Sequence, residues 1–384
     1  MPMLKKPAQT ALPAQTALPA QTALHPSLSR AVLQLVALAA AALIFARPLP
    51  IGRVRALAYA PADVRESRLK PENANLTLPV RAAFVILARN SELHALRATI
   101  RQLEDQFNAL HRYPYVFLNN EPFTAEFKQA MEWATTGDCH FGLVPYEHWS
   151  IPPWVDRLRA RWAMAAMGTK VPYGTSESYR KMCRFESGFF YRHPLLEDYD
   201  YYWRVEPGVE FTCAIPYDPF KCMADSGKQY GFTISLREVA ATVRTLWSTT
   251  NAFRAAYPEY IAANNTLHWL TTPSGDYNMC HFWSNFEIAS LAFFRSPQYT
   301  AYFDFLDRAG GFFLERWGDA PVHSLAAAMF LTKSQVHFFD IGYHHKPFQN
   351  CPTDPDFNSQ HCFCNQNRSV IHNSDSCTRA WLDL

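Results

Sequence analysis

The stretch AAFVILARNSELHALRATIRQLEDQFNALHRYPYVFLNN, residues 82–120, decides the fold. Its first residues, Ala82–Ala88, form a continuous apolar run that is typical of a strand covered on both faces. Tyr115–Asn120 has the composition of a second short strand. Between them an N-cap at Ser91 and an apolar repeat of three and four predict an amphipathic helix, with Leu93, Leu96, Ile100, Leu103, Phe107 and Leu110 on one face. This strand–helix–strand unit predicts a parallel sheet.

The same kinds of pattern continue to the end of the chain. They predict four more strands, at Phe141–Val144, Tyr201–Val205, Tyr230–Ile234 and Val336–Phe339, and three helices, at Arg237–Phe253, Asn285–Phe294 and Gln298–Asp307. Gly310 and Gly311 are expected to close the last helix. No linker composition follows residue 78, so we expect one large α/β domain with a single mostly parallel mixed sheet flanked by helices.

The N-terminal part differs in composition from the rest. AQTALP repeats in residues 1–30 have too little bulk to pack, and predict a disordered tail. Residues 31–51 contain an apolar run interrupted only by Gln34, slightly shorter than the ~20 residues that span a bilayer. A signal-anchor, a cleaved signal peptide and a buried helix are the alternatives, of which we favour the first. The polar, Pro-containing residues 52–78 resemble a stem.

The charge balance argues against a nucleic-acid partner, and the sequons indicate an exported protein. The formal net charge of the 384-residue chain is +2 and no basic run occurs, so no nucleic-acid partner is expected. Sequons at Asn75, Asn264 and Asn367 favour an exported body.

All nine cysteines follow residue 138, and such a body would hold them in an oxidising compartment. The disulfide candidates are the C-terminal four, Cys351, Cys362, Cys364 and Cys377. A zinc site that also uses His361 is the rival interpretation. Because nine is odd, at least one thiol is expected outside any disulfide within the chain.

Four polar residues stand at predicted strand ends and helix starts. Glu206 follows the strand of YYWRVEPGVEF, where Pro207-Gly208 stop it at the edge at which open α/β sheets bind ligands. Asp319, His345 and Glu287 are the others. Each also has a structural interpretation: a loop acid, a helix cap, a loop histidine and an amphipathic helix acid, respectively. The sequence has no Gly-x-Gly-x-x-Gly after the first strand, no P-loop, no Gly-x-Ser-x-Gly and no His-Glu-x-x-His.

Sugar transfer from a nucleotide donor would unite these groups. A departing diphosphate needs a divalent cation, and carboxylate oxygen with imidazole suits Mn²⁺. An oxocarbenium-like sugar needs a carboxylate near its reacting carbon.

Six blocks carry a resemblance to a known family: SYRKMCRFESGFFYRHPLL, YYWRVEPGVEFTC, YGFTISLRE, YNMCHFWSNFEIA, AGGFFLERWGDAPVHS and DIGYHHKPFQNCP. In this order they resemble the fungal Golgi α-1,2-mannosyltransferases of glycosyltransferase family fifteen. The resemblance implies a GT-A-like fold and a Golgi type II membrane protein, with residues 1–30 cytoplasmic and a lumenal catalytic domain over residues 79–384. It also implies retaining, Mn²⁺-dependent transfer of mannose from GDP-mannose to a mannoside or glycoprotein acceptor.

The resemblance assigns roles to seven residues. It implies Glu206 and His345 as metal ligands, Glu287 as nucleophile or oxocarbenium stabiliser, Asp319 as the acceptor's base, and Tyr179, Arg89 and Arg204 as donor-site residues. Transfer to another linkage, mannosylphosphate transfer and an inactive glycan-binding homologue are the alternatives. Whether mannose moves by double displacement or by front-face attack stays open at this point.

Overall fold

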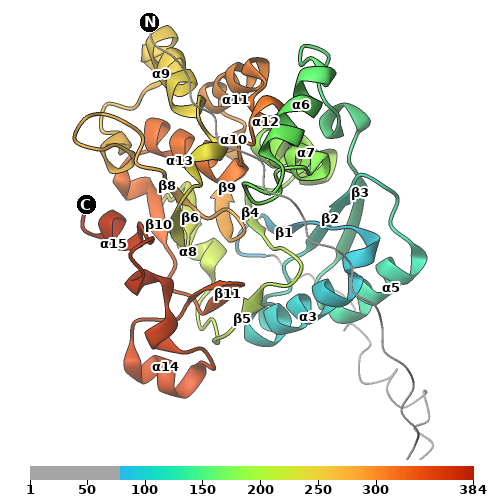
Figure 1. Ribbon diagram of the computed structural model, residues 1–384. Helices are drawn as coiled ribbons and strands as arrows, with labels where there is room; N and C mark the ends of the chain where they lie inside the picture. The colour runs from blue at the N-terminus through green and yellow to red at the C-terminus, as the bar shows by residue number, and fades with distance from the viewer. Residues whose placement is uncertain (1–77) are drawn as a thin grey trace, which may run out of the picture. The chain divides into compact units, whose positions relative to one another are not determined.

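The computed structural model describes residues 78–384, which belong to one compact unit. Its centre is a seven-stranded sheet with the strand order β10-β6-β9-β4-β1-β2-β3 (Figure 1). These strands are β1 (Ala82–Leu87), β2 (Tyr115–Asn119), β3 (Cys139–Leu143), β4 (Tyr201–Arg204), β6 (Tyr230–Phe232), β9 (Glu287–Ser290) and β10 (Val336–Phe338). Only β9 is antiparallel to its neighbours; the other pairings are parallel. The predicted α/β fold with a mostly parallel mixed sheet is confirmed.

Helices cover both faces of this sheet because successive side chains along each strand point alternately into two hydrophobic cores. Phe84 and Trp203 pack into one core with α3 (Leu93–Leu103), α5 (Ala125–Ala134) and α8 (Pro219–Asp225). Val85 and Tyr202 pack into the other core. That core is closed by α6 (Arg157–Met167), α7 (Glu177–Gly188), α9 (Leu246–Ala256), α10 (Leu291–Phe294), α11 (Pro297–Ala309), α12 (Gly311–Leu314) and α13 (Asp319–Phe330). The predicted helix at Gln298–Asp307 is confirmed as α11, and Gly310 ends it at φ 75°.

The helix predicted at Asn285–Phe294 is wrong over its first half. Glu287–Ser290 forms β9, and all four residues are buried. A short apolar segment can form a strand as readily as a helix. Here it forms a strand because β4 and β6 pair with it on both sides. Only Leu291–Phe294 is helical. Glu287 is therefore a buried strand residue, and its interpretation as an amphipathic helix acid is also wrong.

Two other local predictions need correction. The segment expected as a helix over Arg237–Phe253 begins as the end of β7 (Ser235–Arg237), and α9 starts only at Leu246. Ser91 is not the N-cap, because it lies inside a 3₁₀ turn whose last residue, Glu92, accepts the Arg89 backbone N–H. The regular α-helix α3 ends at Leu103. The chain then makes a π-helical turn, Glu104–Asn108, and a last helical turn, α4 (Ala109–His111).

Two small sheets accompany the large one, and one of them connects distant parts of the chain. In the first, β7 pairs with β8 (Cys280–Phe282). In the second, β11 (Tyr343–His345) lies between β12 (Phe348–Asn350) and β5 (Glu210–Phe211). The pairing of β11 with β5 brings the His344-His345 segment beside the loop that follows β4.

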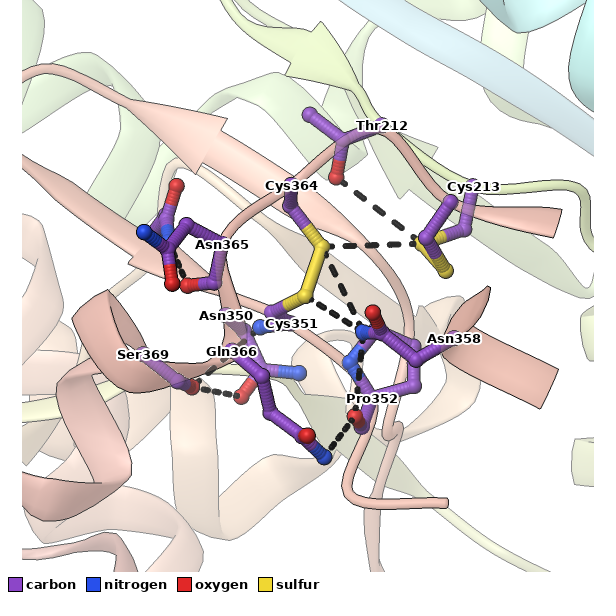
Figure 2. The surroundings of a disulfide bond; sticks show 12 residues. Thr212, Cys213, Asn350, Cys351, Pro352, Asn358, Cys364, Asn365, Gln366 and Ser369 are labelled. Carbon is purple, nitrogen blue, oxygen red and sulfur yellow. Dashed lines mark hydrogen bonds between the residues drawn. A yellow bond between two sulfur atoms is a disulfide. The ribbon is translucent and has the colours of Figure 1, made fainter. Parts of the chain in front are cut away.

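Three disulfides fasten the C-terminal region. Cys213–Cys362, Cys280–Cys377 and Cys351–Cys364 include all four predicted candidates. Figure 2 shows the sulfur atoms of Cys213 and Cys364 in contact, so the disulfides Cys213–Cys362 and Cys351–Cys364 lie next to each other. The zinc interpretation is wrong, because these sulfurs are in disulfides and His361 does not join them. Cys183 stays outside any disulfide, as the odd count requires.

The C-terminal segment ends with two short helices, α14 (Pro355–His361) and α15 (Thr378–Leu382). The predicted tail, signal-anchor and stem lie outside the described residues, apart from Leu78 at the end of the stem. Within residues 78–384, no helix has the length and apolarity to span a bilayer. Of the sequons, Asn264 and Asn367 have exposed side chains and Asn75 lies outside the described part.

Candidate active site

The carboxyl end of β4 presents an arginine that holds two carboxylates. Arg204 Nη1 donates to Asp319 Oδ2 at 2.5 Å, and Nη2 donates to Glu206 Oε1 at 2.5 Å. Arg204 is the last residue of β4, and Gly208 turns the chain at φ 86° just beyond Glu206. Asp319 is the first residue of α13, at a helix N-terminus that favours a negative charge. It does not cap α13, because its carboxylate is engaged across the site.

These three side chains differ in how far they are covered. Arg204 and Asp319 are each 7% exposed, whereas Glu206 is 26% exposed. Glu206 is therefore the member that a ligand can reach without displacing the buried pair. Burial would raise the pKa of Asp319, but Arg204, His323 and the Ser284 hydroxyl outweigh it and lower that pKa to about 2. Asp319 is ionised throughout the physiological range.

A third carboxyl completes the charge distribution around Arg204. Glu186 of α7 is only 4% exposed, and burial, together with Asp319 and Glu206, raises its pKa to about 7 against the opposing pull of Arg204. Burial alone would lower the pKa of Arg204, but these three acids raise it well above its usual value. Three acids around one arginine leave an excess of negative charge, which suits a bound cation.

His345 reaches this end of the sheet from β11. Tyr343, on the same strand, has its pKa raised well above the usual value, chiefly by burial and next by the charge of Glu206. The Tyr343 hydroxyl donates to the Asn285 carbonyl at 3.0 Å. The indole of Trp283 stacks on the His345 ring with 5.3 Å between centroids. The loop between β8 and β9 therefore fixes the position of the His345 imidazole.

One orphaned atom tests whether His345 fits a metal. The Asn285 amide contacts His345 Nδ1 through Nδ2, while its buried Oδ1 has no hydrogen-bond partner. With the amide oxygen facing the ring, Oδ1 accepts a hydrogen bond from Nδ1–H, and Nδ2 takes the position that has no protein partner. That tautomer leaves Nε2 as the free lone pair, the usual arrangement of a metal-binding histidine and its supporting residue. Glu206 and His345 together thus offer an oxygen and a nitrogen ligand that suit Mn²⁺.

Glu287 lies beneath this cluster with no exposed surface. It is the cross-strand partner of Arg204, and its carboxylate accepts from the hydroxyls of Tyr202 and Tyr230. His323 Nδ1 lies 2.8 Å from Glu287 Oε2, and His323 Nε2 lies 3.1 Å from the Glu186 carbonyl. Burial raises the pKa of Glu287 against the pull of His323, whereas the Glu287 carboxylate overcomes burial to raise the pKa of His323. Both carboxylate oxygens are occupied.

The other predicted donor-site residues line the region next to α7. A cavity of about 750 Å³ opens where β1, β2 and β3 end, and Arg89 is part of its wall. Arg89 Nη2 lies 3.4 Å from Ser178 Oγ, which connects it to the start of α7. Next to Ser178, Tyr179 stacks on Tyr173 with 4.2 Å between centroids, and the Arg316 guanidinium lies 5.4 Å from the Tyr179 ring.

The structure thus joins Arg204, Glu206 and Asp319 directly, places Glu287 below them, and supports His345 from the β8–β9 loop. Arg89 and Tyr179 belong to the adjoining cavity and α7. Sequence reasoning missed Ser284, whose hydroxyl donates to Asp319 at 2.6 Å, as well as Asn285 and Glu186. The assignment of residues 285–294 to a helix concealed the loop, and Glu186 has no motif that separates it from a surface acid.

An α/β sheet with acids at the end of a central strand and a cavity over the adjoining parallel strands is typical of enzymes that use nucleotide-linked donors. The model of the glycolipid 2-alpha-mannosyltransferase family matches residues 59–384, and the chain belongs to this family. The family consists of glycosyltransferases, so the class of the enzyme follows from membership.

Named relatives and solved structures agree with this assignment. The chain is 52% identical over 318 residues to glycolipid 2-alpha-mannosyltransferase 1 of Candida albicans, covering 82% of this chain and 74% of the relative. It is 51% identical to alpha-1,2 mannosyltransferase KTR1 of Saccharomyces cerevisiae, covering 79% of this chain and 78% of the relative. Core-mannan synthase A from Aspergillus fumigatus in its Mn/GDP form is 42% identical, with a TM-score of 0.75 and coverage of 82% and 87%. Ktr4p of S. cerevisiae in complex with GDP is 40% identical, with a TM-score of 0.77 and coverage of 81% and 83%.

Proposed function

We propose that this protein is a retaining α-1,2-mannosyltransferase that moves mannose from GDP-mannose to a mannoside hydroxyl in protein glycosylation, with Mn²⁺ as cofactor. The carrying observation is the cluster of Arg204, Glu206 and Asp319, in which acids outnumber the arginine, together with the loop that joins it to His345. In that loop Ser284 bonds Asp319, while Trp283 and Asn285 contact His345. The α-1,2 names of the relatives and the solved relatives with GDP and Mn support the donor and the cation.

In this proposal Glu206 and His345 hold the cation, and Arg204 keeps Glu206 oriented. Bound Mn²⁺ would neutralise the charge that develops on the departing diphosphate. The cavity wall that includes Arg89 receives the nucleotide, since it lies over the carboxyl ends of β1, β2 and β3. Tyr179, supported by Tyr173 and Arg316, faces the donor sugar from the first turn of α7.

The acidity of Asp319 favours front-face attack. A carboxylate with a pKa of about 2 is a weak proton acceptor, so Asp319 orients the acceptor hydroxyl through a hydrogen bond rather than removing its proton. Phosphate oxygens with a pKa of about 6 are stronger bases, and the leaving diphosphate takes that proton. Glu287, whose oxygens are both occupied, supplies negative charge from below and does not bond to the sugar.

Transfer to methyl α-mannoside tests the function. The protein is incubated with GDP-mannose and Mn²⁺ or with EDTA, and the product is analysed by NMR for anomeric configuration and linkage. The proposal expects an α-1,2-linked dimannoside with Mn²⁺ and no product with EDTA. A β-linked product contradicts retention, another linkage contradicts the α-1,2 assignment, and absence of transfer supports an inactive homologue.

We also propose that the protein is a single-pass type II protein of the Golgi membrane, anchored by residues 31–51. The apolar composition of that run, the exposed sequon residues Asn264 and Asn367 and the three disulfides support this location. Protease protection in sealed membranes, read with an antibody to the C-terminus, tests it: the C-terminal domain should be protected until detergent is added.

A further inference from the structure

One helix of the described body has its apolar stripe on the outside. α6 (RLRARWAMAAM, Arg157–Met167) packs through Ala160 and Met164 and adjoins α12. Its larger apolar residues face solvent instead, since Leu158 is 66% exposed and Trp162 is 77% exposed. Exposed apolar side chains that are grouped on one face mark interaction sites, whereas single ones are ordinary.

The geometry of the helix groups these residues. At 100° per residue, Leu158, Trp162, Ala165 and Ala166 fall within a sector of about 100°. All four are exposed. Ala160 and Met164 fall on the opposite side and are buried. The exposed sector is therefore a continuous apolar stripe, which we name the α6 stripe.

Arginines border this stripe on both sides. On the same helical wheel Arg159 follows the stripe on one edge, and Arg161 and Arg157 follow it on the other. All three are exposed, and none forms a salt bridge with any residue between 78 and 384. The helix itself contains no acid, and its acidic neighbour in sequence, Asp156, is occupied as the N-cap by the backbone N–H groups of Leu158 and Arg159. Arg157 lines a cavity that also contains Asp304 and Asp307, but it forms no salt bridge with either.

Apolar bulk and a preceding aromatic extend the same surface. Trp154, four residues before Leu158, is 53% exposed and anchors its indole N–H on the Asp307 carbonyl at 2.8 Å. An exposed Leu and Trp flanked by arginines is the composition of helices that lie in a membrane interface, where Trp occupies the headgroup level and arginine pairs with anionic lipid. A purely apolar protein partner would not account for three unpaired arginines at the rim.

We propose that the α6 stripe docks the body of this protein onto an anionic lipid surface, with Leu158 and Trp162 entering the headgroup region and Arg159 and Arg161 contacting lipid phosphates. The surface lies at the rim of the molecule beside α7 and α12 (Figure 1). Docking here is separate from any anchoring by residues 31–51, and does not depend on the proposed transfer reaction.

A spin label on the full chain tests this docking locally. The label is attached at Ala166→Cys, and a matched label is placed at Gln129→Cys on exposed α5. The unsubstituted protein, treated with the same reagent, gives the background from native thiols. Accessibility to oxygen and to a water-soluble nickel chelate is measured without lipid, with neutral phosphatidylcholine vesicles, and with vesicles that also contain phosphatidylserine.

The proposal expects the α6 label to gain oxygen contact and lose nickel contact in anionic vesicles, while the α5 label does not change. Arg159→Gln with Arg161→Gln should lower the ratio of lipid-facing to water-facing α6 label about 30-fold, at about 1 kcal/mol for each arginine. The control pair Arg97→Gln with Arg101→Gln, on exposed positions of α3, should leave the ratio unchanged. All variants should transfer mannose to a soluble acceptor at the unsubstituted rate.

Three results would overturn the docking. One is an α6 label that stays water-facing in anionic vesicles. Another is a label already covered without lipid, which means that another part of the chain or a second copy covers the stripe. The third is equal burial in neutral and anionic vesicles with no effect of the arginine substitutions, since the arginines then play no part.

Discussion

The buried Arg204 gives the sharpest prediction about stability. Arg204→Met keeps the length of the side chain but leaves Asp319, which is 7% exposed, without its positive partner. Removing one member of a buried pair costs about 3–5 kcal/mol. The lowering of the Asp319 pKa from 3.8 to about 2 corresponds to about 2.5 kcal/mol of net stabilisation of the ionised carboxylate by its surroundings, among which Arg204 is the largest favourable contributor. We therefore expect the free energy of unfolding at pH 7 to fall by about 3–5 kcal/mol.

The sign of the pH dependence follows from the same carboxylate. A lowered pKa means that Asp319 contributes stability above pH 3.8, which is lost as the pH falls through about 2. In the variant, burial without Arg204 raises the pKa of Asp319, so mild acid protonates it and removes the unpaired charge. The difference in stability between wild type and variant should consequently be smaller at pH 4.5 than at pH 7.

Urea unfolding of Arg204→Met, Asp319→Asn and the double variant measures the pair without assuming additivity. The coupling energy should be at least about 2 kcal/mol. Arg81→Met is the matched control, because Arg81 pairs with Asp200 at 2.6 Å but the two side chains are 69% and 49% exposed, so its effect on stability should be much smaller than that of Arg204→Met. A loss below 1 kcal/mol for Arg204→Met, with additive effects in the double variant, would refute the reasoning.

Three further predictions concern other groups. The pKa of Glu186 is raised to about 7, so its contribution to stability, about 3 kcal/mol, is complete below pH 4.5 and is lost as the pH rises through 7. Without metal, Glu186→Gln should therefore raise the free energy of unfolding at pH 8 but not at pH 4, whereas the exposed control Glu132→Gln should not. No gain in stability at pH 8 would count against this prediction. Mass spectrometry after reaction with a fluorinated mannosyl donor should find no adduct on Glu287, and an adduct there would exclude front-face attack. Removing Cys280–Cys377, which spans 97 residues, should cost about 5 kcal/mol in urea unfolding, against about 3 kcal/mol for Cys351–Cys364, which spans 13; equal losses would contradict the loop-entropy basis.

Much of the fold could be predicted because its signals are local. The apolar run of β1 and the three-and-four repeat of α3 each appear within one short window. β1 occurs at the expected position, and α3 begins where the repeat begins but ends at Leu103, so that Leu110, predicted on the apolar face, is exposed. β9 could not be predicted in this way. Its four residues become a strand because β4 and β6, both distant in sequence, provide partners on either side.

The site shows the same division. Glu206 could be located because Pro207-Gly208 stop a recognisable strand beside it. The meeting of residues near 206 with residues near 345 depends on the pairing of β5 with β11, two very short strands with no pattern of their own. Glu186 and Asn285 could not be recognised from the sequence because their roles depend on their surroundings. Glu186 is distinguished by its burial, and Asn285 by a buried amide oxygen that has no hydrogen-bond partner.

The central claim is that one cation is shared by Glu206 and His345. Electron spin echo measurements on the Mn²⁺–GDP complex of the protein test it directly, since they detect a nitrogen bound to manganese. The account predicts a histidine nitrogen signal in the unsubstituted protein that disappears in His345→Gln, and weaker Mn²⁺ binding in Glu206→Gln. A nitrogen signal that persists in His345→Gln, together with unchanged Mn²⁺ affinity in Glu206→Gln, would contradict it.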